Sequence, residues 1–231
     1  MTIFFRDHTN AAQSVQELSA PPHYPAINDQ TVYRQGGKRL LDLILVCLAA
    51  PQVVLLVGIL ALLVACTGGK PFYSQLRVGR HGRLYRMWKL RTMVPDADQK
   101  LESYLANNPA ARAEWDDTQK LKNDPRVTAI GCFLRQSSLD ELPQIWNVLR
   151  GEMSLVGPRP MMTEQRGLYP GRQYYDMRPG ITGLWQISAR NTSSFADRAW
   201  YDSTYNQAMS LSEDCRILGA TVGVVLRGTG H

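Results

Sequence analysis

The fold is decided by one apolar stretch, 43-LILVCLAAPQVVLLVGILALLVAC-66, in which Gln52 is the one polar residue. As a helix, these 24 residues extend about 36 Å, which is enough to cross the hydrocarbon core of a bilayer. A domain within a chain of 231 residues is too small to bury such a segment on all sides. The sequence therefore predicts that this stretch resides in a membrane.

Basic residues flank the stretch on both sides. Arg34, Lys38 and Arg39 precede it, and no acidic residue occurs in 43–95. The basic residues that follow are Lys70, Arg77, Arg80, Arg83, Arg86, Lys89 and Arg91. Because basic flanks favour the cytoplasmic side, both ends are expected there. Pro51 removes a backbone hydrogen bond near the middle and kinks the helix. We therefore predict a re-entrant hairpin, with a single spanning, proline-kinked helix as the alternative.

The chain divides into three parts around this stretch. Residues 1–33 are polar and interrupted by prolines, which predicts a disordered tail. The first residues lack an apolar core followed by a small-residue cleavage site, so a cleaved signal peptide is not expected. Residues 34–69 form the predicted membrane segment, and residues 70–231 the predicted cytosolic domain. The net charge of +6 suits phosphorylated ligands, anionic lipid or nucleic acid.

Several chemistries are not expected. The cysteines are scattered, without a Cys-x-x-Cys pair or a histidine at ligand spacing, so neither zinc nor a disulfide framework is predicted. The histidines form no cluster. The sequence also lacks the Gly-x-x-x-x-Gly-Lys-Ser/Thr loop, the Gly-x-Ser-x-Gly elbow, the His-Glu-x-x-His motif and a dinucleotide fingerprint.

The remainder predicts an α+β fold that is mostly helical, with a small sheet and interfacial amphipathic helices. Alternation over 83–90 indicates a strand. Residues 96–120 are rich in helix formers and broken near Pro109, and residues 212–226 predict a last helix. The basic, aromatic stretch 71–95 adjoins the membrane segment, so contact with lipid phosphates is favoured over nucleic acid.

The stretch 138-SLDELPQIWNVLRG-151 permits two interpretations of the adjacent acids Asp140 and Glu141. Ser138 and Glu141 have the spacing of a capping box, and acids suit a first helical turn. Pro143 leaves open whether the cap is Ser138 or Asp140, and Gly151 is a helix stop. One apolar face is predicted from Leu142, Ile145, Trp146 and Leu149. Taken alone, this segment favours capping over catalysis.

From about Arg34 to Arg227 the chain resembles the bacterial sugar transferases, the monotopic polyprenyl-phosphate phosphoglycosyl transferases. Besides the apolar segment with its central proline, the matching motifs are Lys38-Arg-Leu-Leu-Asp42, Pro71-Phe-Tyr-Ser-Gln75, Lys89-Leu-Arg-Thr-Met93, Asn123-Asp-Pro-Arg-Val-Thr128, Leu134-Arg135, Ser138-Leu-Asp-Glu-Leu-Pro-Gln144, Gly157-Pro-Arg-Pro160, Pro179-Gly-Ile-Thr-Gly183 and Ala189-Arg-Asn191. The family commonly has Ser where Ala50 precedes the membrane proline. The chain resembles the short exopolysaccharide type.

The resemblance implies a reaction. A UDP-sugar donates its sugar 1-phosphate to undecaprenyl phosphate and releases UMP, with Asp140 as nucleophile and with Mg²⁺ held by Asp140 and Glu141. The chemistry is sensible, because a carboxylate nucleophile divides the attack of one phosphate on another into two easier steps. Magnesium neutralises diphosphate oxygens and suits a site with one or two carboxylates.

The resemblance and the chemistry also indicate binding residues. Arg135 and Arg159 are candidate phosphate clamps, since a guanidinium pairs two oxygens at once. Arg190, with Asn191, resembles the family's nucleotide-contacting position. Capping and catalysis are compatible at Asp140, because a helix N-terminus is itself an anion site.

The implied setting is the cytoplasmic membrane of a bacterium, with the catalytic domain on the cytosolic face. The implied partners are membrane lipids, undecaprenyl phosphate and a UDP-sugar. UDP-galactose is the first choice of donor and UDP-glucose the second. No nucleic acid is expected, and a homo-oligomer is left open. Two other functions remain: a transferase that moves the sugar alone and releases UDP, and a non-catalytic basic membrane module.

Overall fold

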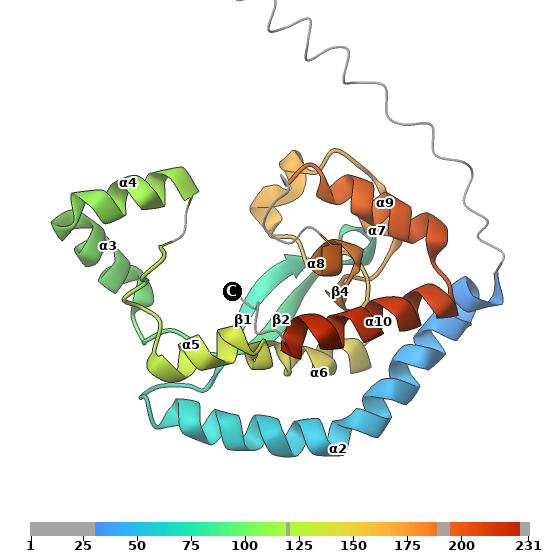
Figure 1. The fold of residues 1–231 in the computed structure, drawn as a ribbon, viewed down its shortest axis with the longest axis horizontal. Helices are drawn as coiled ribbons and strands as arrows, with labels where there is room; N and C mark the ends of the chain where they lie inside the picture. Colours follow the sequence, from blue (N-terminus) through green and yellow to red (C-terminus); the bar gives the residue numbers. More distant parts are fainter. Residues whose placement is uncertain (1–30, 119–120, 189–194, 227–231) are drawn as a thin grey trace, which may run out of the picture.

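The computed structural model describes residues 31–118, 121–188 and 195–226. Figure 1 shows a long bent helix, α2, lying along one side of a mixed domain that contains short strands and many short helices. The domain is α+β and mostly helical, as the sequence predicts. Its helical region begins with a π-helical turn, Tyr33–Gly37, that runs directly into α2 (Lys38–Ala65).

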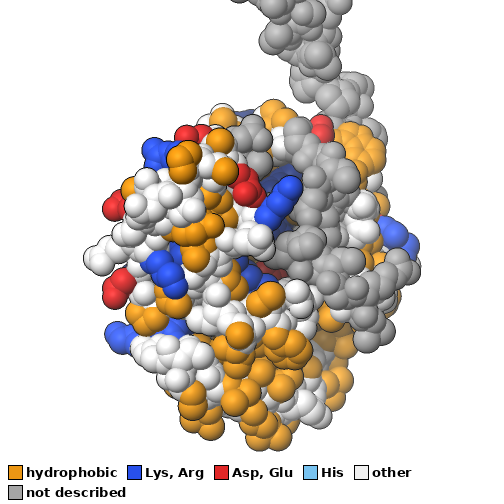
Figure 2. All heavy atoms as spheres, turned by 60° about the vertical axis from the view of Figure 1, so that its left-hand side comes forward, with side chains coloured by type: hydrophobic (Ala, Val, Ile, Leu, Met, Phe, Trp, Pro, Cys, Tyr) orange, Lys and Arg blue, Asp and Glu red, His pale blue; other side chains and the backbone are white. Residues whose placement is uncertain are grey.

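Helix α2 contains Pro51 and bends near its middle (Figure 1), so the predicted kink is present. Its two halves pack against different parts of the same domain. Val46 joins a core cluster with Met153, whereas Val64 joins a cluster with Leu134. Between these contacts the helix exposes Leu48, Val54, Leu55 and Ile59. In Figure 2 hydrophobic side chains gather at the base of the molecule, the side along which α2 runs in Figure 1.

Both ends of α2 are also tied to the domain by polar contacts. At the start, Asp42 is buried and accepts hydrogen bonds from the hydroxyl of Ser154 and the backbone N–H of Leu155. At the end, the guanidinium of Arg91 donates to the carbonyl of Val64 at 3.1 Å, which is the favoured place for a cation at a helix C-terminus. The helix therefore leaves the domain and returns to it.

The strands form two small sheets. β1 (Phe72–Val78) and β2 (Leu84–Leu90) make an antiparallel hairpin, so the strand predicted over 83–90 is confirmed. β3 (Ser154–Val156) and β4 (Gly180–Thr182) pair in parallel. A Cβ atom on Gly180 would lie 2.1 Å from the backbone nitrogen of Gly157, so glycine is required where these two segments meet.

Helices make up most of the rest of the described fold. The predicted helical stretch 96–120 forms α3 (Ala97–Asn107) and α4 (Pro109–Thr118), with the break at Pro109 confirmed. The last predicted helix is α10 (Leu211–Leu226). The others are α5 (Ala129–Gln136), α6 (Gln144–Leu149), α7 (Gln173–Asp176), α8 (Leu184–Ser188) and α9 (Arg198–Ala208).

The predicted capping box at Ser138 is wrong. Ser138 has φ 56° and ψ 18°, and its side chain makes no capping hydrogen bond. Asp140 and Glu141 lie in a separate 3-10 turn, η3 (Leu139–Glu141), and α6 begins only after Pro143. The predicted apolar face is also only partly right, because Trp146 points outward with 54% of its surface exposed. Ser138, in its left-handed conformation, turns the chain before α6 begins. The Ser-x-x-Glu spacing alone carries no information about this conformation.

Candidate active site

Asp140 and Glu141 meet a lysine that comes from the hairpin. The ammonium nitrogen of Lys89, on β2, lies 2.7 Å from Glu141 Oε1 and 3.5 Å from Asp140 Oδ2. The turn η3 packs directly against β2, so the two acids and the cation are held by two separate elements. Asp140 is buried, while Lys89 and Glu141 are partly exposed, so one side of the group remains accessible from outside.

The ionisation of Asp140 is set by opposing effects. Burial is the largest and raises the pKa of the carboxyl, and the nearby charge of Glu141 raises it as well. Lys89 lowers the pKa through its charge and its hydrogen bond, and Arg135 lowers it by a smaller amount. The net effect is a raised pKa. A buried carboxylate with a shifted pKa beside a cation is typical of catalytic acids.

A buried asparagine fixes the position of Lys89. Asn147, on α6, is fully buried, and its amide oxygen accepts the backbone N–H of Trp88 at 3.1 Å. Its amide nitrogen donates to the carbonyl of Arg86 at 2.7 Å. The side chain thus joins α6 to the free edge of β2 on either side of residue 87. This attachment holds the strand that carries Lys89 next to the turn that carries Asp140.

Arg135 reaches the same region from α5. Its Nε donates to the hydroxyl of Thr92 at 2.9 Å, just beyond the end of β2. The close approach needs Gly131, where an added Cβ would lie 2.0 Å from the carbonyl oxygen of Thr92. Because Nε is occupied by Thr92, the terminal nitrogens are the part of the guanidinium that can face a phosphate near Asp140.

Arg159 makes different contacts from Arg135. It is exposed, and its guanidinium carbon is 5.5 Å from the centre of the Trp185 ring, which it shares with Arg198. The two predicted phosphate clamps are therefore held by different residues, Arg135 by Thr92 and Arg159 by Trp185. Arg190 and Asn191 lie outside the described residues.

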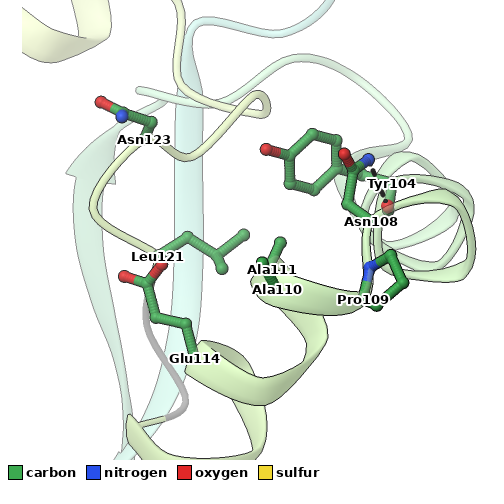
Figure 3. A pocket seen from close by; sticks show the side chains of 8 residues that line it. All are labelled: Tyr104, Asn108, Pro109, Ala110, Ala111, Glu114, Leu121 and Asn123. Carbon is green, nitrogen blue, oxygen red and sulfur yellow. Dashed lines mark hydrogen bonds between the residues drawn. The ribbon is translucent and has the colours of Figure 1, made fainter.

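A pocket of about 320 Å³ lies at the α3–α4 hairpin, away from these acids (Figure 3). Its one charged side chain, Glu114, accepts the backbone N–H of Lys122 at 2.7 Å, and Asn108 donates to the carbonyl of Tyr104. The lining residues are Tyr104, Asn108, Pro109, Ala110, Ala111, Glu114, Leu121 and Asn123. None of them belongs to the group around Asp140.

The two carboxylates fit magnesium. They supply the hard oxygen ligands that Mg²⁺ prefers, and magnesium is commonly bound through one or two carboxylates together with substrate phosphates and water. No group of three or more His, Cys, Asp and Glu side chains suited to a metal occurs among the described residues. Asp140 and Glu141 would leave the remaining coordination positions to substrate phosphate and water.

Sequence reasoning missed Lys89, Thr92 and Asn147 as parts of this site. Lys89 and Thr92 stand in the Lys89–Met93 motif, and alternation placed Lys89 on a strand. Nothing in the sequence placed that strand opposite residue 140, 51 positions further along the chain. Asn147 was missed because an asparagine at the polar edge of a predicted helix is normally expected to be exposed.

Comparison with known proteins identifies the family. The family model "Bacterial sugar transferase" matches residues 33–228, and the chain belongs to that family. It is 49% identical over 199 residues to the "UDP-galactose-lipid carrier transferase" of Erwinia amylovora, covering 84% of this chain and 41% of the relative. It is 50% identical over 165 residues to the "Undecaprenyl-phosphate galactose phosphotransferase" of Salmonella typhimurium, covering 71% and 35%.

A shorter relative matches over most of its length. The "Exopolysaccharide production protein ExoY" of Sinorhizobium fredii is 42% identical over 203 residues, covering 84% of this chain and 88% of the relative. The chain therefore spans less than half of the first two relatives and most of the third.

Proposed function

We propose that this protein transfers a sugar 1-phosphate from a UDP-sugar to undecaprenyl phosphate and releases UMP. The observation that carries the proposal is the group of Asp140, Glu141 and Lys89, a desolvated carboxylate beside a second acid and a cation. Family membership supports the reaction class. The printed names of the relatives from Erwinia amylovora and Salmonella typhimurium support galactose and undecaprenyl phosphate as first choices.

Asp140 is the nucleophile in the proposed reaction. A carboxylate oxygen attacks the phosphorus that bears the sugar, and an acyl-phosphate bond forms as the bond to the bridging oxygen breaks. UMP leaves with the electron pair. In the second step a phosphate oxygen of the lipid attacks the same phosphorus, and Asp140 departs as a carboxylate. No net proton is gained or lost.

The surrounding residues have distinct tasks. Lys89 lowers the pKa of Asp140 against the larger effect of burial, and so favours the ionised carboxylate. Arg135, fixed by Thr92, presents its terminal nitrogens to the phosphate that is being transferred. Glu141 and Asp140 would hold Mg²⁺, which would neutralise charge on the diphosphate. Arg190 and Asn191 remain predicted nucleotide contacts.

We propose that α2 enters and leaves the cytosolic leaflet of the cytoplasmic membrane. The helix is apolar and long enough to cross a membrane, with 11% of its most apolar window buried. Both of its ends contact the same domain, through Asp42 and Val64, which a helix crossing to the far side could not do. Phe133 on α5 and Trp146 on α6 are also exposed, and both of these helices lie close to α2 in Figure 1. The acceptor lipid would therefore reach Asp140 from this side.

The test is to identify the products. Protein in lipid nanodiscs is supplied with undecaprenyl phosphate and either UDP-galactose or UDP-glucose, and UMP and UDP are quantified separately. UMP formed in step with lipid-linked sugar is expected, and Asp140→Asn should abolish it. Release of UDP would show that the sugar alone is moved. Absence of turnover with every UDP-sugar would favour a non-catalytic membrane module.

A further inference from the structure

Tyr73, in the Pro71–Gln75 motif, is the cross-strand partner of Lys89. In the register of the hairpin the two residues lie directly opposite each other, so their side chains project from the same face of the sheet. Side chains in such pairs have Cβ atoms about 5 Å apart. The ammonium nitrogen of Lys89 lies 2.7 Å from Glu141 Oε1 and 3.5 Å from Asp140 Oδ2. Tyr73 is therefore the neighbour that β1 provides to the candidate active site.

The fold makes little use of the side chain of Tyr73. Tyr73 is 52% exposed, whereas Met87, on the same face of β2, is 4% exposed and belongs to the core. The hydroxyl of Tyr73 makes no hydrogen bond within the described part of the chain. By contrast, the hydroxyls of three buried tyrosines donate to partners inside the domain; they are Tyr169, Tyr174 and Tyr205. Both the ring and the hydroxyl of Tyr73 are thus accessible to a substrate.

Tyr73 also lies on the more open strand of the hairpin. The outer edge of β2 is occupied by the side chain of Asn147, which bonds to backbone groups on that strand. On β1, the next residue on the same face as Tyr73 is Gln75, whose side-chain oxygen accepts the guanidinium of Arg77 at 2.6 Å. Neither Asn147 nor Gln75 covers the exposed ring. The surface of β1 beside Lys89 is therefore open to a ligand.

The covalent structure of the donor decides which of its parts reaches Tyr73. In the proposed reaction Asp140 attacks the phosphorus that bears the sugar, so the hexose is joined through a single oxygen to an atom at Asp140. The uracil is separated from the same phosphorus by a second phosphate and a ribose. Phosphate oxygens are best bound by cations, and Lys89 and Arg135 supply these. The hexose is therefore the uncharged part of the donor that lies next to the group around Asp140.

Tyrosine is chemically suited to a hexose. A pyranose ring presents a face of C–H groups and a rim of hydroxyls. A tyrosine side chain combines an apolar ring with a hydroxyl that bonds to a polar partner. Ligand sites commonly pair such an aromatic surface with a few polar groups that fix orientation.

We propose that Tyr73 is a hexose-binding residue, with its ring packed on the C–H face of the sugar and its hydroxyl bonded to a sugar hydroxyl. This assignment rests on the proposed function, because it places the sugar-bearing phosphate at Asp140. The sugar stays on the same phosphorus while UMP leaves and the lipid phosphate arrives. The contact with Tyr73 is therefore kept through both steps, and it contributes to the choice of donor.

The experiment compares the binding of donors with and without the sugar. Dissociation constants for UDP-galactose, UDP-glucose and UDP are measured on the full protein in nanodiscs, in an Asp140→Asn background that prevents turnover. Tyr73→Phe removes the hydroxyl alone, and Tyr73→Leu removes the ring as well. Phe72→Leu is the matched control, because Phe72 is the preceding residue, is 42% exposed and projects from the opposite face of β1.

Tyr73→Phe should weaken the binding of UDP-galactose by about threefold to tenfold, which corresponds to one hydrogen bond. Tyr73→Leu should weaken it further, because the contact with the ring is also lost. The affinity for UDP should not change in either variant, and Phe72→Leu should leave all the constants unchanged. Equal losses for UDP and for the UDP-hexoses would place Tyr73 at the nucleotide and overturn the proposal. Unchanged binding of both UDP-hexoses would also overturn it.

A second measurement tests whether Tyr73 acts through its neighbours. With Asp140 intact, Tyr73→Leu should raise the KM for UDP-galactose and leave the KM for undecaprenyl phosphate and the acidic limb of the rate–pH profile unchanged. A raised KM for undecaprenyl phosphate alone would place Tyr73 at the membrane surface, and a displaced acidic limb would mean that it acts through Lys89. Either result would overturn the proposal. Failure of the proposed reaction would appear separately, as turnover that persists in Asp140→Asn.

Discussion

Replacing Lys89 by Met should move the acidic limb of the rate–pH profile upward. The proposed nucleophile must be ionised, and Lys89 lowers the pKa of Asp140 against the effect of burial. Removing the ammonium group takes away that stabilisation of the carboxylate. A larger fraction of Asp140 is then protonated at a given pH, so turnover at low pH should fall more than turnover at high pH.

The size of the effect follows from the geometry. Two unit charges 3.5 Å apart attract by about 1 kcal/mol when water screens them fully and by about 5 kcal/mol at an effective dielectric constant of about 20. Lys89 keeps 25% of its side chain exposed and Asp140 11%, so the pair lies between these limits. Because one pH unit corresponds to about 1.4 kcal/mol, even the screened limit displaces the limb by most of one unit.

The assay is kcat/KM for the UDP-sugar, measured as UMP release in nanodiscs across the acidic pH range. Lys89→Arg keeps the charge and should keep the acidic limb near its original place, even if its rate falls. Lys100→Met, on the exposed surface of α3, is the control for losing a lysine. A uniform loss of rate in Lys89→Met, with the acidic limb unmoved, would refute the view that Lys89 sets the ionisation of Asp140.

Three further predictions concern topology, scaffold and pH. In a cysteine-free background, cysteines at the open position Gly36 and at the exposed Lys70 should both be shielded from a membrane-impermeant reagent applied outside the cell; labelling at one site alone would indicate a spanning helix. Asn147→Ala should lower the unfolding free energy by about 1–3 kcal/mol for each β2 backbone group left unpaired, while the exposed Asn107→Ala should not, as chemical denaturation would show. Because burial raises the pKa of Asp202 from 3.8 to about 7, the stability of the wild-type protein should fall as pH rises between these values. In Asp202→Asn the melting temperature should change less with pH over this range. Equal slopes of melting temperature against pH in the two proteins would contradict this prediction.

The sequence anticipated those elements whose causes are local. Uninterrupted apolarity predicted α2, Pro51 predicted its bend, and alternation predicted the strand over 83–90. The break at Pro109 was also anticipated, because proline cannot continue a preceding helix. Each of these features depends on residues within a few positions of one another.

The predictions that were wrong or missing concern backbone conformation or contacts between distant parts of the chain. The capping box was wrong because Ser138 adopts a left-handed conformation, which a Ser-x-x-Glu spacing cannot reveal. Trp146 was assigned to the core by helical periodicity, but the buried face of α6 carries Asn147, whose amide serves β2. In the candidate site, Arg135 lies near enough to Asp140 to lower its pKa. Lys89 reaches Asp140 from β2, a contact between separate elements that the sequence could not indicate.

The central claim is that Asp140 carries the sugar phosphate during the reaction. The direct measurement is to incubate the protein with UDP-galactose and no lipid acceptor, quench the mixture and map the modified peptide by mass spectrometry. The account predicts one hexose phosphate on the peptide that contains Asp140, with UMP released up to one equivalent and no label in Asp140→Asn. A label on another residue, or normal turnover by Asp140→Asn, would contradict it.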